Sequence, residues 1–457
     1  MRIKSIYIIS ISLIAAIGGF LLGFDGSVIS GAIPFYKTLF GLKDGSFLLG
    51  FSVSCIIWGS ILGNLVAGPL SDKVGRKISL IIAAILFSVT GLLCAFAQNI
   101  ETFIAGRIIG GLGVGIAILV APIYIAEIAP AKKRGWLVSF NQLLIVIGLS
   151  VAYFTNYFIL KTVKDPLINW RWMLGVEIIP SIVYFITLLF IPESPRWLIM
   201  QGKDSLAKNI LIKVNDQAEG NKEYDQIKKN VLSEKKAGIS VQAKYLFTKK
   251  MAPMLMIGFG LAILQQFSGI NAILYYAPMV FESAGGERGA AFMQAIVLGV
   301  VFVMMTIVSM FLIDRLGRKP LLYIGVALMA LSLTATGIAF RNAQINSTLV
   351  LISILSFIAG FSISLGPVMW ALLSEIFPNR IRGFAISVVG AANALASFLV
   401  ATFFPIQLKE FGNSNTYFIY AGCMFFCLWF IWKYVIETKG KSLEEIETKL
   451  IGQNELY

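Results

Sequence analysis

Histidine is absent from this chain of 457 residues, and cysteine occurs only four times. Histidine is the side chain that most often binds metals and transfers protons near neutral pH, so any proton chemistry here must use carboxyl groups. The cysteines are Cys55, Cys94, Cys423 and Cys427. All lie in apolar stretches, with no paired spacing that would indicate a disulfide framework. No nucleophile–base pair is visible, and we expect neither an enzyme nor a bound metal or cofactor.

Charged residues are also scarce. They make up 14% of the chain, against roughly 25% in soluble domains, and the mean hydropathy is +0.81. This composition predicts an all-α membrane protein. The first apolar run extends from about Ile6 past Gly31, which is too long for a cleaved signal peptide and shows no cleavage site. We interpret it as a retained first span.

The net charge of +14 would suggest a nucleic-acid partner in a soluble protein. Here the basic residues concentrate in alternate loops between apolar runs, and in the segment 196–250. The loop residues are Lys73, Arg76, Lys77, Lys132, Lys133, Arg134, Arg315, Arg318, Lys319, Arg380 and Arg382. This asymmetry follows the positive-inside rule. It predicts cytoplasmic termini and a cytoplasmic central loop, and it removes the argument for nucleic acid.

Runs of about 20 apolar residues, the length that crosses a bilayer, occur twelve times. They lie near 6–31, 47–70, 78–96, 100–121, 137–158, 171–191, 252–281, 291–313, 320–339, 348–371, 384–404 and 415–436. We therefore expect a six-helix bundle over 1–191, a linker with short helices over 192–250, a second six-helix bundle over 251–436 and a tail over 437–457.

Two motifs recur in corresponding places of the two bundles. Residues 72–77 (DKVGRK) are echoed by 314–319 (DRLGRK), and residues 127–135 (EIAPAKKRG) by 375–383 (EIFPNRIRG). The offsets are 242 positions from Arg76 to Arg318 and 248 from Arg134 to Arg382. Duplicated halves of this kind build transporters whose substrate site lies between the halves near the middle of the membrane.

Six motifs together resemble the sugar-porter family of the major facilitator superfamily. They are DKVGRK at 72–77, NWRW at 169–172, PESPRW at 192–197, QQFSGIN at 265–271, GPVMW at 366–370 and ETKGK at 437–441. The resemblance covers essentially the whole chain and is strongest to bacterial proton-coupled xylose and glucose transporters. It implies two pseudo-symmetric six-helix bundles that work by alternating access. One departure is Ile436, where the family usually has proline.

Three charged residues lie within expected spans: Asp25, Arg107 and Glu177. A charge inside the bilayer is costly unless it is paired or faces water, so it marks a pathway or a relay by default. One interpretation is a static ion pair. The other is a proton switch, in which protonation of Asp25 breaks its pair with Arg107. The resemblance favours the switch, because proton-coupled members carry aspartate at this position, and some bacterial members carry a carboxylate at that of Glu177.

Amide and tyrosine side chains in the seventh span are candidates for binding a sugar, whose hydroxyl groups both donate and accept hydrogen bonds. These are Gln265, Gln266, Asn271 and Tyr275. On an ideal helix they spread over roughly 220°, so we predict a break near Ser268 and Gly269. The alternative is that the amides only link neighbouring helices.

The resemblance adds Gln142, Gly366, Trp370 and Asn393 as sugar-contacting positions, with a helix break at Gly366. Three positions depart from polar or aromatic residues that relatives often carry. They are Leu149, Phe302 and Ala394. These departures leave the particular sugar open.

A third group consists of charged residues near the ends of spans. They are Asp72, Arg76, Glu127, Arg134, Glu193, Arg196, Asp314, Arg318, Glu375 and Arg382. They are either a solvated face or, as the resemblance implies, interhelical salt bridges that latch one conformation. The glycine-rich stretch 106–115 resembles a phosphate-binding loop, but no strand precedes it. We interpret its glycines as small-residue pairs for close helix packing.

These features together predict proton symport of a monosaccharide across a plasma membrane, with sugar, protons and the lipid bilayer as partners and a monomer as the working form. The compact loops favour a bacterial inner membrane. A facilitative uniporter of the same fold and a non-transporting sugar sensor remain as alternatives. Asp25 argues against the first, and the short tail argues against the second.

Overall fold

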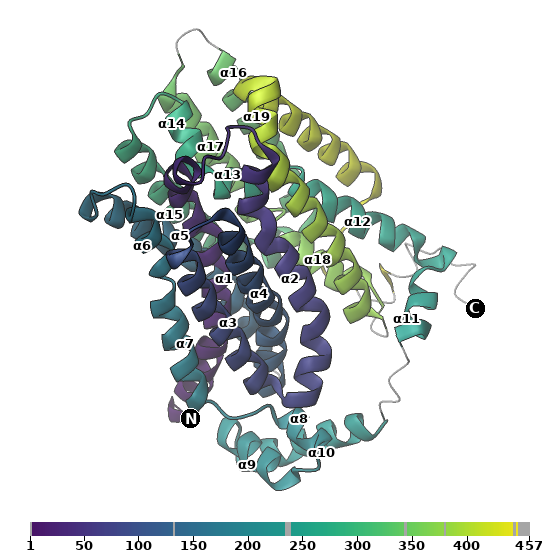
Figure 1. The fold of residues 1–457 in the computed structure, drawn as a ribbon. Helices are drawn as coiled ribbons and strands as arrows, with labels where there is room; N and C mark the ends of the chain where they lie inside the picture. The colour runs from purple at the N-terminus through teal and green to yellow at the C-terminus, as the bar shows by residue number, and fades with distance from the viewer. Residues whose placement is uncertain are drawn as a thin grey trace. The chain divides into compact units, whose positions relative to one another are not determined.

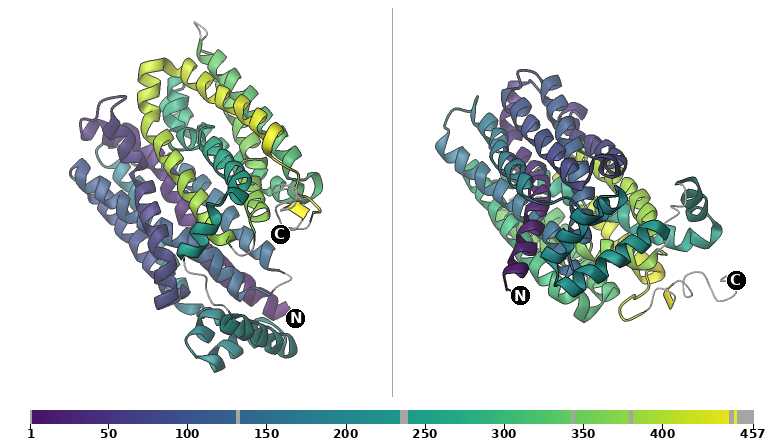
Figure 2. Two further views of the ribbon diagram at one scale, coloured as in Figure 1. Left: turned by 90° about the vertical axis from the view of Figure 1, so that its right-hand side faces the viewer. Right: turned by 90° about the horizontal axis from the view of Figure 1, so that it is seen from below.

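The computed structural model describes residues 2–130, 133–233, 239–341, 345–378, 381–441 and 445–446, with side chains described except at 2–5, 230, 232–233, 239–242 and 314. Helices dominate this part of the chain, and it contains no strand. The chain forms two compact units, of which the first comprises residues 1–40 and 55–236 and the second residues 41–54 and 237–457. Figure 1 labels the helices and Figure 2 shows them from two further sides.

Long helices form the body of the first unit. They are α1 (Arg2–Leu39), α2 (Phe47–Val74, from Cys55 onward), α3 (Arg76–Phe96), α4 (Ile100–Ile128), α5 (Arg134–Thr162), and α6 (Asn169–Gly175) with α7 (Ile178–Phe190), which together make one span. α3 packs mainly on α4, and α1 mainly on α5. The linker contributes α8 (Pro195–Met200), α9 (Asp204–Val214) and α10 (Gln217–Ser233), which share a small apolar core.

The second unit repeats this pattern. After α11 (Ile239–Leu246) and a 3₁₀ turn at Lys249–Met251, it contains α12 (Ala252–Gln266), α13 (Ile270–Tyr275), α14 (Ala277–Ser283), α15 (Arg288–Leu316), α16 (Arg318–Arg341), α17 (Ser347–Ile363), α18 (Pro367–Ile376) and α19 (Arg382–Tyr434). Among the described residues, eleven helical stretches are long and apolar enough to cross a membrane. The longest, α19, is interrupted at Gly412 (φ 75°, ψ 165°) and supplies two spans. Twelve spans follow, as predicted.

Close backbone approaches explain the glycines of α4. A Cβ atom at Gly111 or Gly115 would lie 2.1 or 2.2 Å from a carbonyl oxygen of α2, and one at Gly110 would lie 2.5 Å from the Thr90 hydroxyl on α3. These positions therefore exclude any side chain. The glycine-rich stretch serves helix packing, and the likeness to a phosphate loop is coincidental.

The first turns of α2 belong to the second unit, although the sequence suggested that every residue before 191 lies in the first bundle. The Ser54 hydroxyl lies 2.5 Å from that of Thr402 on α19. A Cβ atom at Gly50 would lie 1.8 Å from the Thr402 carbonyl oxygen. The lack of a side chain at Gly50 thus allows α2 to contact the α19 backbone directly.

Candidate functional site

A buried ionic cluster lies within the helices of the first unit. Asp25 on α1 and Arg107 on α4 form an ion pair, and both side chains are wholly buried. The guanidinium also donates to the Asp25 backbone carbonyl over 3.2 Å. Glu177, at the junction of α6 and α7, is equally buried and its carboxyl group interacts with that of Asp25. The structure thus brings together all three charged residues singled out within spans.

This cluster contains two carboxyl groups for one guanidinium. Two carboxyl groups hydrogen-bond to each other only when one of them carries a proton. One oxygen of Asp25, one of Glu177 and two nitrogens of Arg107 lack a hydrogen-bond partner among the described residues. Buried polar groups without partners are costly, so these atoms are under-satisfied in the arrangement that the structure shows.

A network of amide side chains lies in the second unit. Gln266 on α12 donates to Asn393 on α19 over 3.1 Å and accepts from Asn271 on α13 over 2.9 Å. Asn393 donates in turn to Gln265 over 2.8 Å. Asn271 also donates to the Ser397 hydroxyl over 2.6 Å, a contact that the sequence did not suggest because an isolated serine within an apolar helix carries no recognisable pattern.

Two helix breaks shape this network. α12 ends at Gln266 and α13 begins at Ile270, with Gly269 between them in the left-handed region (φ 81°). The predicted break near Ser268 and Gly269 is confirmed. A second break, also as predicted, separates α17 from α18 before Pro367. Gln265 donates to the Leu365 carbonyl over 2.6 Å, so one side chain connects the two breaks.

The other expected sugar-contacting residues lie on or next to α5, α13 and α18. Trp370 lies on α18 and is 39% exposed, Gly366 precedes the first turn of that helix, and Tyr275 ends α13 partly buried. Gln142 lies on α5 of the first unit and is exposed. Of the three departures from relatives, Leu149 and Phe302 are buried, and Phe302 packs edge-on against Phe361.

A third cluster, in the first unit, contains several of the charged residues that were predicted to form salt bridges. Arg76 holds Glu127 with two hydrogen bonds of 3.0 and 3.1 Å. Glu193 accepts from the N–H groups of Arg76 and Lys77 over 2.9 and 3.1 Å, at the start of α3. A carboxylate is stabilised there by the free N–H groups and the dipole of the helix. The Ser194 hydroxyl completes the cluster by donating to Glu127.

The second unit contains the same arrangement. Arg318 pairs with Glu375 over 2.8 Å, and the Thr438 hydroxyl donates to Glu375 over 2.6 Å. Glu437 accepts from the N–H groups of Arg318 and Lys319, both over 3.0 Å, at the start of α16. The pairs Glu193–Ser194 and Glu437–Thr438 are separated by 244 positions. This third repeated motif is visible in the sequence. Its spacing, close to that of the other two, identifies Ser194, Glu437 and Thr438 as members of the two charged clusters.

The remaining charged candidates have other contacts. Asp72 lies 3.3 Å from Arg76, whereas Arg134 pairs with Glu223 of the linker helix α10 over 3.6 Å. Arg382 donates to the Phe377 carbonyl over 3.3 Å. Arg196 lines a pocket with Glu127, Arg134 and Glu223. The side chain of Asp314 lies outside the described residues.

The two capping glutamates differ in acidity. Burial raises the pKa of Glu193, although the N–H groups that donate to its carboxylate oppose the rise. Burial acts on Glu437 in the same direction, but hydrogen bonds from the N–H groups of Lys439, Arg318, Lys319 and Thr438 outweigh it and lower the pKa of Glu437. As the pH falls, Glu193 should take up its proton before Glu437.

This difference predicts opposite pH dependences. The stability that Glu437 contributes is present above the ordinary value of 4.5 and is lost as the pH falls through its lowered pKa. Ionised Glu193 costs stability at neutral pH, and this cost disappears as the pH falls through its raised pKa towards 4.5. Melting temperatures of the purified protein, Glu193→Gln and Glu437→Gln between pH 3 and pH 7 will measure both contributions to stability. Difference curves of the same sign for the two variants would contradict the assignment.

Known proteins share this architecture over nearly the whole chain. The family model described as "Sugar (and other) transporter" matches residues 11–450. The D-xylose-proton symporter of Escherichia coli is 40% identical, with 97% of this chain and 96% of that protein covered. The arabinose-proton symporter of Bacillus subtilis is 37% identical, with 96% and 94% covered. The inward open structure of the E. coli xylose transporter XylE superimposes with a TM-score of 0.86 at 38% identity, covering 97% of this chain and all of that one. The chain belongs to the sugar transporter family of the major facilitator superfamily, whose members are multi-pass membrane transporters and not enzymes.

Proposed function

We propose that this protein is a symporter that couples monosaccharide uptake to inward proton movement by alternating access. The observation that carries the proposal is the wholly buried pair of carboxyl groups, Asp25 and Glu177, beside the single guanidinium of Arg107. Such a cluster can take up a proton at Asp25 and release Arg107, which changes the contact between α1 and α4. A uniporter has no need of an ionisable group at this place.

The amide network supports an uncharged, hydroxyl-rich substrate. Its members, Gln265, Gln266, Asn271 and Asn393, both donate and accept, and in the structure they satisfy one another. A sugar can exchange its hydroxyl groups for these internal bonds at little net cost. The relatives named for xylose and arabinose favour a pentose or a closely similar hexose. Gln142, Tyr275, Gly366 and Trp370 are proposed as further contacts.

Coupling requires that protonation favour the same conformation that binds sugar, and thermodynamic linkage makes the effect reciprocal. A membrane potential adds about 2.3 kcal/mol per 100 mV for each charge moved inward, which is sufficient for accumulation of tens-fold. We further propose that both termini and the linker lie in the cytoplasm of a bacterial cell, since the basic loops fall on that side. The twin clusters of Arg76 and Arg318 would then brace the cytoplasmic ends of the helices, and one chain would suffice for transport.

The test is uptake of labelled xylose, arabinose, glucose, galactose and myo-inositol into proteoliposomes, with and without an inward proton gradient. Accumulation above equilibrium that a protonophore abolishes is the expected result and identifies the sugar. Equilibration that ignores the gradient would establish the uniporter. Specific binding with no flux in either condition would establish the sensor.

The sugar site predicts a loss of affinity when Gln266 becomes alanine. This change removes the amide that would exchange its bonds with Asn393 and Asn271 for bonds to the sugar, and the loss of two bonds to the ligand corresponds to a loss of affinity of roughly tenfold or more. Trp370→Ala should weaken binding as well. Asn415→Ala, which alters an exposed amide of α19, is the matched control. Titration calorimetry measures all three, and unchanged affinity in both site variants would place the pocket elsewhere.

A further inference from the structure

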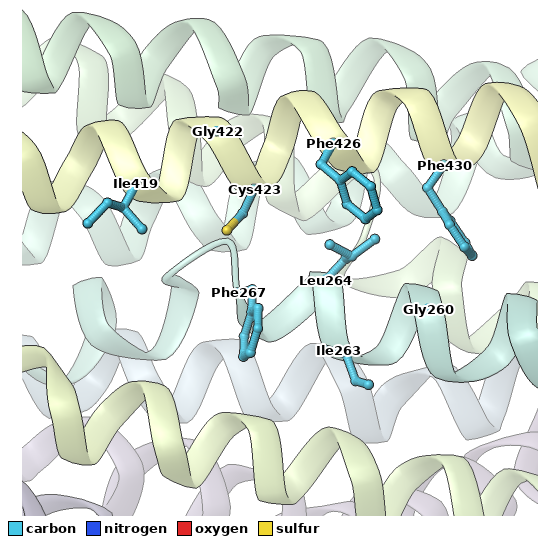
Figure 3. A pocket seen from close by; sticks show the side chains of 9 residues that line it. All are labelled: Gly260, Ile263, Leu264, Phe267, Ile419, Gly422, Cys423, Phe426 and Phe430. Carbon is cyan, nitrogen blue, oxygen red and sulfur yellow. The ribbon is translucent and has the colours of Figure 1, made fainter.

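An apolar groove of about 500 Å³ lies in the second unit, between α12 and the part of α19 that follows Gly412. Figure 3 shows Leu264 and Phe267 on one side of it and Cys423 and Phe426 on the other. Apart from the Cys423 thiol, its lining consists of glycine and hydrocarbon side chains. The groove is separate from the amide network and from the charged clusters.

Two glycines give the groove its form. At Gly260 the Phe430 ring lies against α12, where it would be 2.2 Å from a Cβ atom, so the groove is closed at this end. At Gly422 a Cβ atom would have no neighbour within 4 Å. The helix α12 ends at Gln266, so its last two turns and Phe267 form one wall of the groove. The result is a bounded hollow, in contrast to the convex surface of side chains that covers most membrane helices.

Both walls of the groove belong to membrane spans. The groove is partly open, because Phe267, Ile419 and Phe426 are 36%, 45% and 52% exposed. Hydrocarbon is the solvent at such a surface, and a narrow apolar hollow in it matches a linear chain of methylene groups. We propose that the groove binds one acyl chain of a membrane phospholipid.

The bound chain would touch the hinge of the sugar site. Phe267 is the C-cap residue of α12, immediately after Gln266. The Tyr420 ring of α19 packs against Gly269 of the break, where it would lie 2.9 Å from a Cβ atom. An acyl chain bound between Phe267 and α19 therefore contacts the helix break that positions Gln266. The link between the bound acyl chain and sugar binding rests on the proposed sugar site, whereas the binding of the acyl chain itself does not.

The test uses the full-length protein in nanodiscs that contain a phosphatidylethanolamine with a photoactivatable group midway along one acyl chain. After illumination, mass spectrometry should locate cross-links at residues 264–267 and 422–426. Gly422→Phe places a ring in open space and should reduce these cross-links severalfold. Ile338→Phe, a matched change at an exposed position of α16 (47% exposed), should leave them unchanged.

Three outcomes would overturn the proposal: labelling of the groove no denser than labelling around Ile338, no effect of Gly422→Phe in a variant with an unchanged melting temperature, or labelling only by a photoactivatable free fatty acid. Because the unmodified protein supplies the first readout, the test does not depend on the variant folding. Gln266→Ala separates the two proposals, since it should reduce sugar binding and retain the cross-links.

Discussion

Asp25→Asn is expected to abolish sugar accumulation while sugar exchange across the membrane continues. Asparagine has the shape of aspartic acid and can still accept a hydrogen bond from Arg107, but it cannot gain or lose a proton. The variant would resemble the permanently protonated protein. It should bind sugar and exchange labelled for unlabelled sugar, yet a proton gradient would no longer drive net concentration.

Proteoliposomes measure both properties in the same preparation: counterflow for exchange and gradient-driven uptake for accumulation. Asp165→Asn, at an exposed position between α5 and α6, is the control and should behave as the unmodified protein. Accumulation at the normal level in Asp25→Asn would show that the buried pair is a static packing element. Glu177→Gln then becomes the next variant, since its carboxyl group also contacts Asp25.

Gly23→Ala should be among the most damaging single methyl additions in the first unit. A Cβ atom at Gly23 would lie 1.8 Å from the carbonyl oxygen of Ile145, and the backbone of α5 cannot yield without separating from α1. Overpacking of a core costs about 1–3 kcal/mol, and a clash between two backbones lies at or beyond the upper end. Asp25 lies two residues further along α1, so transport should fail together with stability.

Gly135→Ala in the first turn of α5 is the matched control, because no atom outside its own helix and chain neighbours lies within 4 Å of the added methyl group and alanine favours a helix by up to about 1 kcal/mol over glycine. Thermal unfolding of the two purified variants in the same detergent makes the comparison. Equal melting temperatures would mean that α1 and α5 are less closely packed than described.

The fold could be predicted because membrane spans follow from local composition: about 20 apolar residues suffice to define each one. The break at Gly269 could also be predicted, since Gln265, Gln266 and Asn271 could not otherwise share a face. The contact partners of individual side chains could not be predicted from the sequence. The pairing of Arg134 with Glu223 depends on where α10 docks, and the role of Ser397 depends on how α19 passes α13. Such contacts arise from tertiary packing, which leaves no periodic trace in the chain.

The two capping glutamates, Glu193 and Glu437, indicate how much sequence was duplicated when the two halves arose. Glu193 lies just after the sixth span and Glu437 just after the twelfth, and each accepts hydrogen bonds from the first turn of the third span of its own half, α3 or α16. The segment that was copied in evolution therefore did not stop at the membrane boundary. It ran at least two residues further, through a glutamate and a hydroxyl residue. The first residues of the linker and of the tail therefore derive from one ancestral sequence.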